Sequence, residues 1–131
     1  MTNKEIILKV NEGFCEGNTE KIIRYITDDV RCEVTGSAAS VSAEAFRKKA
    51  GNEYFTGLPS IKVKAVFEKD DWVAVEGEVQ CDKADGSMLD AFFFDVYLLE
   101  NGKIRELRSY IIERNTSFYK NENYNYLTIK I

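Results

Sequence analysis

The chain contains one stretch that is apolar on both of its predicted faces, Ala91-Phe92-Phe93-Phe94-Asp95-Val96-Tyr97-Leu98-Leu99. It is too short to cross a membrane and too rich in aromatic residues to favour a helix, so we predict a strand covered on both faces. Asp95 is the only charged residue in this stretch. Burying an ionised carboxylate is costly unless the group is paired, hydrogen-bonded or neutralised. Asp95 is therefore the leading candidate for a functional residue, and a structural ion pair is the alternative.

The next residues predict a hairpin. Asn101-Gly102 is a strong turn signal, and it joins the predicted strands 88–99 and 103–113. Upstream, residues 61–67 alternate between apolar and charged side chains, and residues 72–81 form another predicted strand. We therefore expect four consecutive antiparallel strands.

The turn geometry decides the face that Asp95 occupies. If the turn has two residues, Asp95 lies opposite Arg108 and the two form a cross-strand ion pair. If Gly102 is instead the left-handed residue of a three-residue loop with a bulge, Asp95 lies opposite Leu107. In that second register, Asp95 belongs to the wall of an apolar pocket together with Phe93, Tyr97, Ser109 and Ile111. A change of one residue in register separates the two alternatives.

The first part of the chain is predicted to be mainly helical. Residues 3–16 place apolar side chains at helical spacing, and Gly17 ends this helix. Thr19 is expected to cap a second helix that continues to Ile26. A short strand at 30–35 and a third helix at 42–51 follow. Helices followed by a run of strands indicate an α+β fold in which the helices pack on one face of a curved sheet.

Composition limits the possible functions. The 131 residues form one domain with a net charge of −4 and no basic stripe, so we expect no nucleic-acid partner. No apolar stretch is long enough for a membrane helix, and no signal-peptide pattern is present. Three widely spaced cysteines predict reduced thiols in the cytoplasm. The absence of histidine removes histidine-based catalysis and the usual nitrogen ligands of metals, so we expect no metal and no cofactor.

Several motifs in this order resemble the SnoaL-like, ketosteroid-isomerase-related branch of the nuclear transport factor 2 superfamily. The resemblance implies a cone-shaped α+β fold, with three N-terminal helices packed on a strongly curved, mostly antiparallel sheet that encloses a pocket. It covers residues 1–114 as one domain and leaves residues 115–131 as a C-terminal extension, either an added strand or a tail. The motifs that carry it are Phe14-Cys15-Glu16-Gly17-Asn18, Tyr25-Ile26-Thr27-Asp28-Asp29-Val30, Glu33-Val34-Thr35-Gly36, Val73-Ala74-Val75-Glu76-Gly77-Glu78, Phe94-Asp95-Val96-Tyr97, Asn101-Gly102-Lys103-Ile104 and Leu107-Arg108-Ser109-Tyr110.

The resemblance also suggests roles for individual residues. Asp95 matches the carboxylic acid that polarises the substrate oxygen in ketosteroid isomerase. Glu33, three residues before Gly36, is the nearest match to the general base of that enzyme, whereas Val10 replaces the tyrosine of its oxyanion hole. The expected lining of the pocket is Phe14, Phe93, Tyr97, Leu107, Ser109 and Ile111.

Three functional hypotheses remain open. The first is a cofactor-independent isomerase or lyase that moves a proton on an apolar carbonyl compound, with Glu33 as base and Asp95 as hydrogen-bond donor. The second is a non-catalytic module that binds or senses a small apolar ligand, and the third is an interaction domain with a vestigial cleft. In each case we expect a homodimer, because the other face of the Asp95 strand also needs a cover. That face carries Phe92, Phe94, Val96 and Leu98.

Overall fold

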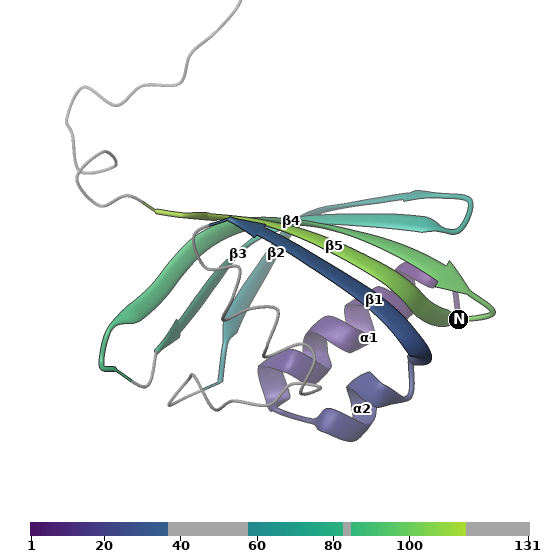
Figure 1. Cartoon of the computed structure of the whole chain (residues 1–131), viewed down its shortest axis with the longest axis horizontal. Helices are drawn as coiled ribbons and strands as arrows, with labels where there is room; N and C mark the ends of the chain where they lie inside the picture. The colour runs from purple at the N-terminus through teal and green to yellow at the C-terminus, as the bar shows by residue number, and fades with distance from the viewer. Residues whose placement is uncertain (37–57, 83–84, 115–131) are drawn as a thin grey trace, which may run out of the picture.

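The computed structural model describes residues 1–36, 58–82 and 85–114. They form a five-stranded sheet with two helices packed on one of its faces (Figure 1). The elements are α1 (Asn3–Glu16), α2 (Thr19–Ile23), β1 (Ile26–Gly36), β2 (Ser60–Lys69), β3 (Trp72–Asp82), β4 (Met88–Glu100) and β5 (Lys103–Glu113). The predicted third helix at 42–51 and the C-terminal extension lie outside the described residues.

The first helix forms as its sequence predicts. The Thr2 side chain caps it by accepting a hydrogen bond from the Glu5 N–H at 3.1 Å. Gly17 ends it in the left-handed conformation, with φ of 65°. The inner stripe of α1 is buried, including Ile7 and Val10, which have no exposed surface.

The second helix is shorter than predicted, and its cap is different. Asn18, and not Thr19, is the N-cap, and its side-chain oxygen accepts from the Lys21 N–H at 3.2 Å. The helix ends at Ile23, and Ile26 is already the first residue of β1. A tertiary contact accounts for this early end, because the Ile104 N–H donates to the Tyr25 carbonyl at 2.6 Å and so joins this segment to β5.

The strand order in the sheet is β1-β5-β4-β3-β2. The four consecutive strands β2 to β5 pair antiparallel as predicted, whereas β1 pairs parallel with β5 at one edge. Alternate side chains of each strand point toward the helices. These inner-face side chains and the helices form the core, whose buried members include Ile7, Ile22, Val75, Phe93, Tyr97, Leu99, Ile104, Leu107 and Ile111.

The β4–β5 hairpin combines features of both predicted registers. Asn101 and Gly102 have φ of 52° and 78°, as a two-residue type I′ turn requires, and Glu100 pairs with Lys103. Beyond Leu99 the register shifts by one residue at a β-bulge, so that Asp95 lies opposite Ser109. Neither predicted partner of Asp95 was therefore right.

The bulge nevertheless turns Asp95 toward the inner face, as in the second of the two registers. Arg108 lies opposite Val96, and its guanidinium stacks 5.1 Å above the Trp72 ring. The predicted cross-strand ion pair between Asp95 and Arg108 is therefore wrong.

A glycine on β3 makes room for an aromatic ring on β4. Gly77 lies opposite Phe93, and a Cβ atom at Gly77 would lie 2.6 Å from the Phe93 ring and 2.5 Å from the Lys62 carbonyl oxygen. The Phe93 ring thus lies on the bare backbone of β3, next to Asp95 on the inner face.

Candidate functional site

Asp95 occupies the middle of the inner face of the sheet. The antiparallel ladders place it between Val75 on β3 and Ser109 on β5. Its nearest same-face neighbours on β4 are Phe93 and Tyr97, and both are buried. Asp95 as a whole residue has intermediate exposure, whereas Phe93 and Tyr97 on either side of it are buried.

Two hydroxyl groups hold the Asp95 carboxyl group. Ser109 Oγ donates to Asp95 Oδ1 at 2.5 Å, and Tyr97 Oη donates to Asp95 Oδ2 at 3.3 Å. Only 8% of the Ser109 surface and 2% of the Tyr97 surface are exposed, so both donors are fixed within the core. Each carboxyl oxygen therefore has one protein donor, and none of the donors is a cation.

This environment shifts the ionisation of both acids in the cluster. Burial raises the pKa of Asp95 from 3.8 to about 6, and the hydrogen bonds from Ser109 and Tyr97 oppose that shift. Burial and the neighbouring Asp95 carboxylate raise the pKa of Tyr97 well above its ordinary value. At neutral pH, Asp95 is therefore mostly ionised and Tyr97 is protonated.

Glu33 is not brought together with Asp95. It lies on β1 opposite Arg108 of β5, and its side chain is exposed. Its neighbours Cys32 and Val34 pack against the core, so the two-residue period of the strand directs Glu33 to the outer face.

The predicted lining residues lie in the core or pack against it. Phe93, Tyr97, Leu107, Ser109 and Ile111 are buried on the same face as Asp95. Phe14 of α1 is partly buried and packs against this cluster. Their contact with a ligand stays a prediction.

Asn11 is a polar core residue that the sequence analysis missed. It is 8% exposed, and its Nδ2 donates to the Ile7 carbonyl at 3.1 Å within α1. The available signal was its position, because Asn11 follows Ile7 by four residues and falls on the apolar stripe of the helix. Among the described residues, Asn11 and Ser109 are buried polar residues, in addition to the hydroxyl-bearing Tyr97.

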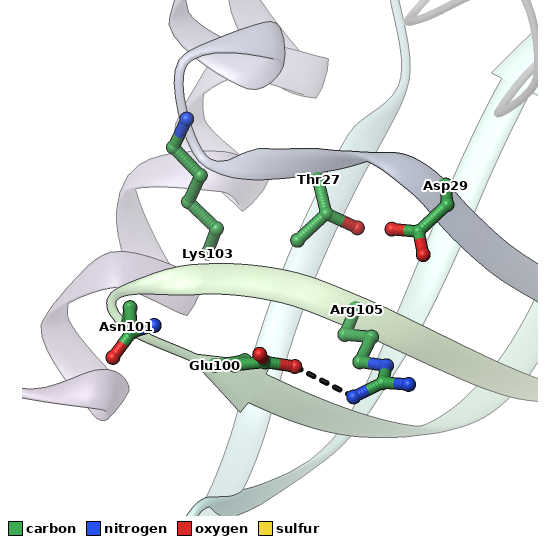
Figure 2. Close-up of a pocket in the computed structure, with 6 residues that line it drawn as sticks. All are labelled: Thr27, Asp29, Glu100, Asn101, Lys103 and Arg105. Atoms are coloured by element: carbon green, nitrogen blue, oxygen red, sulfur yellow. Dashed lines mark hydrogen bonds and ion pairs between the residues drawn. The ribbon is translucent and has the colours of Figure 1, made fainter.

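A separate polar hollow lies where β1 begins and the β4–β5 hairpin turns. It has a volume of about 460 Å³, and Figure 2 shows Glu100 and Arg105 reaching toward each other, with a 2.7 Å ion pair between them. The β1–β5 ladder is irregular there, because residues 27–30 of β1 correspond to Arg105 alone on β5. None of the predicted site residues lines this hollow, whose lining consists of Thr27, Asp29, Glu100, Asn101, Lys103 and Arg105.

Comparisons with known proteins agree with this architecture. The model of the SnoaL-like domain family matches residues 7–107. No curated protein matches the chain at a significant level.

Solved structures share the fold at low sequence identity. IdmH, a candidate polyketide cyclase from Streptomyces antibioticus, is 15% identical with a TM-score of 0.68, over 85% of this chain and 92% of that chain. A nuclear transport factor 2-like protein of unknown function from Burkholderia pseudomallei is 15% identical with a TM-score of 0.67, over 83% and 90%. TerC, crystallised with polyporic acid, is 18% identical with a TM-score of 0.64, over 90% and 95%.

Proposed function

Because the chain belongs to the SnoaL-like domain family, we propose that it binds a small, mainly apolar molecule against the inner face of its sheet, with Asp95 orienting the ligand. One observation carries this proposal. Asp95 carries a carboxyl group on a mainly apolar sheet face, and it has no cationic partner among the described residues that surround it. A group that costs stability in this way is typical of binding and catalytic sites. TerC, a protein of similar fold, was co-crystallised with a small organic molecule, polyporic acid, and this supports the proposal.

Binding is a better-supported function than two-carboxylate catalysis. Proton transfer between two groups would need a second acid or base near Asp95, and Glu33 points to the outer face. A simpler proton transfer is a second candidate, because the Asp95 pKa of about 6 lies close to neutral pH, where one carboxyl group can both accept and return a proton.

The outer face of the sheet supports a homodimer as part of this proposal. Large apolar side chains from four strands are exposed there, including Phe67 at 58% and Ile112 at 63%. Trp72, Phe94 and Tyr110 extend the same face, and their exposed fractions lie between 37% and 45%. A second copy that covers this surface would remove it from water. None of the three cysteines forms a disulfide within the described residues, which is compatible with the proposal that the protein works in the cytoplasm.

Ligand-observed NMR can test the binding proposal. A panel of small aromatic phenols, quinones and ketones is added to the wild-type protein, to Asp95→Leu and to the control Glu33→Gln. We expect saturation-transfer signals with the wild type and the control, and their loss with Asp95→Leu at pH 7.5, where chemical denaturation verifies that the variant is folded. Binding that is unchanged in Asp95→Leu would contradict the role of Asp95, and no binding to the wild type would contradict the function.

A further inference from the structure

The hydrogen bonds around Asp95 determine whether this cluster offers a ligand hydrogen-bond donors or acceptors. A serine or tyrosine hydroxyl has one proton to donate. Ser109 and Tyr97 both direct that proton to Asp95, one to each carboxyl oxygen. Neither hydroxyl therefore has a donor left for a ligand. An ionised carboxylate only accepts hydrogen bonds. The cluster can therefore accept hydrogen bonds from a ligand but cannot donate any to it.

We propose that the ligand of this site carries a hydrogen-bond donor, namely a hydroxyl group on an apolar ring framework, and donates it to the ionised Asp95. The proposal rests on the proposed function and specifies its ligand. A carboxylate has about four lone-pair directions, and the two protein hydroxyls use two of them. A ligand hydroxyl that reaches the inner face of the sheet at Asp95 would use one of the remaining directions. A ligand with only acceptor groups, such as a ketone or an ether, would cover the carboxylate without donating a hydrogen bond to it. The carboxylate would then lose its hydrogen bonds to water without replacement, which is costly in a desolvated site.

Among the described residues, no other charged side chain acts on Asp95. Val75 lies opposite it on β3, and Cys32 on β1 acts electrostatically on Tyr97. Asn11, on the buried side of α1, does not titrate. Within the described parts of the chain, Ser109 and Tyr97 are the side chains that act on the pKa of Asp95, which lies at about 6. The carboxyl group is thus an acceptor at pH 7.5 and gains a proton to donate at pH 5.

A matched set of probes can test this polarity. The probes are 2-naphthol, which can donate, and 2-methoxynaphthalene and 2-acetylnaphthalene, which can only accept; their dissociation constants are measured by calorimetry or ligand-observed NMR. At pH 7.5 we expect wild-type protein to bind 2-naphthol about tenfold more tightly or better than either acceptor. The preference should fall at pH 5, and it should be lost in Asp95→Asn, whose amide can both donate and accept.

The variant Ser109→Ala tests the electrostatic role of Ser109 separately from a structural one, because it should change the pH at which the preference for 2-naphthol is lost. Ser109 lowers the pKa of Asp95, so its removal should shift the loss of the 2-naphthol preference to higher pH. Equal binding of donor and acceptor probes at pH 7.5, or a preference that persists in Asp95→Asn, would overturn the proposed polarity while leaving the binding function intact. Failure of all three probes to bind wild-type protein would overturn the polarity and the binding function together.

Discussion

Replacing Asp95 with Asn should make the protein more stable at neutral pH. Burial raises the pKa of Asp95 from 3.8 to about 6, so between these values the folded protein holds a proton that the unfolded chain has released. The stability of the wild type therefore decreases as the pH rises through this window, and the full penalty is present above pH 6. A pKa difference of about two, at 1.36 kcal/mol for each pH unit, corresponds to a penalty of about 3 kcal/mol. Asn removes the charge but weakens the hydrogen bonds of Ser109 and Tyr97, so we expect a net gain of about 1 to 2 kcal/mol at pH 7.5.

Urea denaturation at several values between pH 4 and pH 7.5 measures this effect. The stability difference between Asp95→Asn and the wild type should be near zero or slightly unfavourable at pH 4 and should grow in favour of the variant up to about pH 6.5. Glu33→Gln is the matched control, because it removes an exposed carboxylate from the outer face and should show no such trend. A difference that does not change with pH, or a variant that is less stable at pH 7.5, would refute the proposal that Asp95 is a desolvated and unpaired carboxylate.

Three further predictions concern the scaffold. Gly77→Ala should destabilise the protein by about 1 to 3 kcal/mol in urea denaturation, because its Cβ would collide with Phe93 and the β2 backbone; an unchanged midpoint would contradict the close approach. Gly102→Ala should cost about 1 kcal/mol in the same assay, since φ at this position is 78°, and a neutral effect would argue against the type I′ turn. Phe94→Glu and Ile112→Glu should halve the mass measured by sedimentation if the outer face joins two copies, and a wild type that already sediments as a monomer would rule out the homodimer.

The sequence alone was sufficient to predict most elements of the fold, because strand alternation and helix stripes are local patterns. It was not sufficient to predict where α2 ends, since Ile26 fits both the helical stripe and the strand, and only the contact with β5 selects the strand. The outward orientation of Glu33 follows from its alternation with Cys32 and Val34, whereas its position opposite Arg108 depends on the parallel pairing of β1 with β5, a long-range choice that no local pattern specifies. The exact partner of Asp95 depends on a bulge at Arg105 that lacks a glycine or proline signal.

The bulge in the β4–β5 hairpin has an evolutionary consequence, because the face that a side chain occupies depends on whether the register shifts by an odd or an even number of residues. A two-residue turn with one bulged residue and a three-residue loop with a bulge at its glycine both direct Asp95 to the same side of the sheet, because both registers differ from the ideal two-residue hairpin by one position. Relatives can therefore exchange turn length for a bulge and keep a carboxyl group at this place. An insertion or deletion of one residue between 99 and 106, with no compensating change, would instead reverse every side chain of one strand relative to its partner. If β4 is the strand that reverses, its outer-face aromatic side chains turn inward and Asp95 turns to the outer face. Insertions and deletions in this hairpin should therefore be tolerated in pairs and selected against singly.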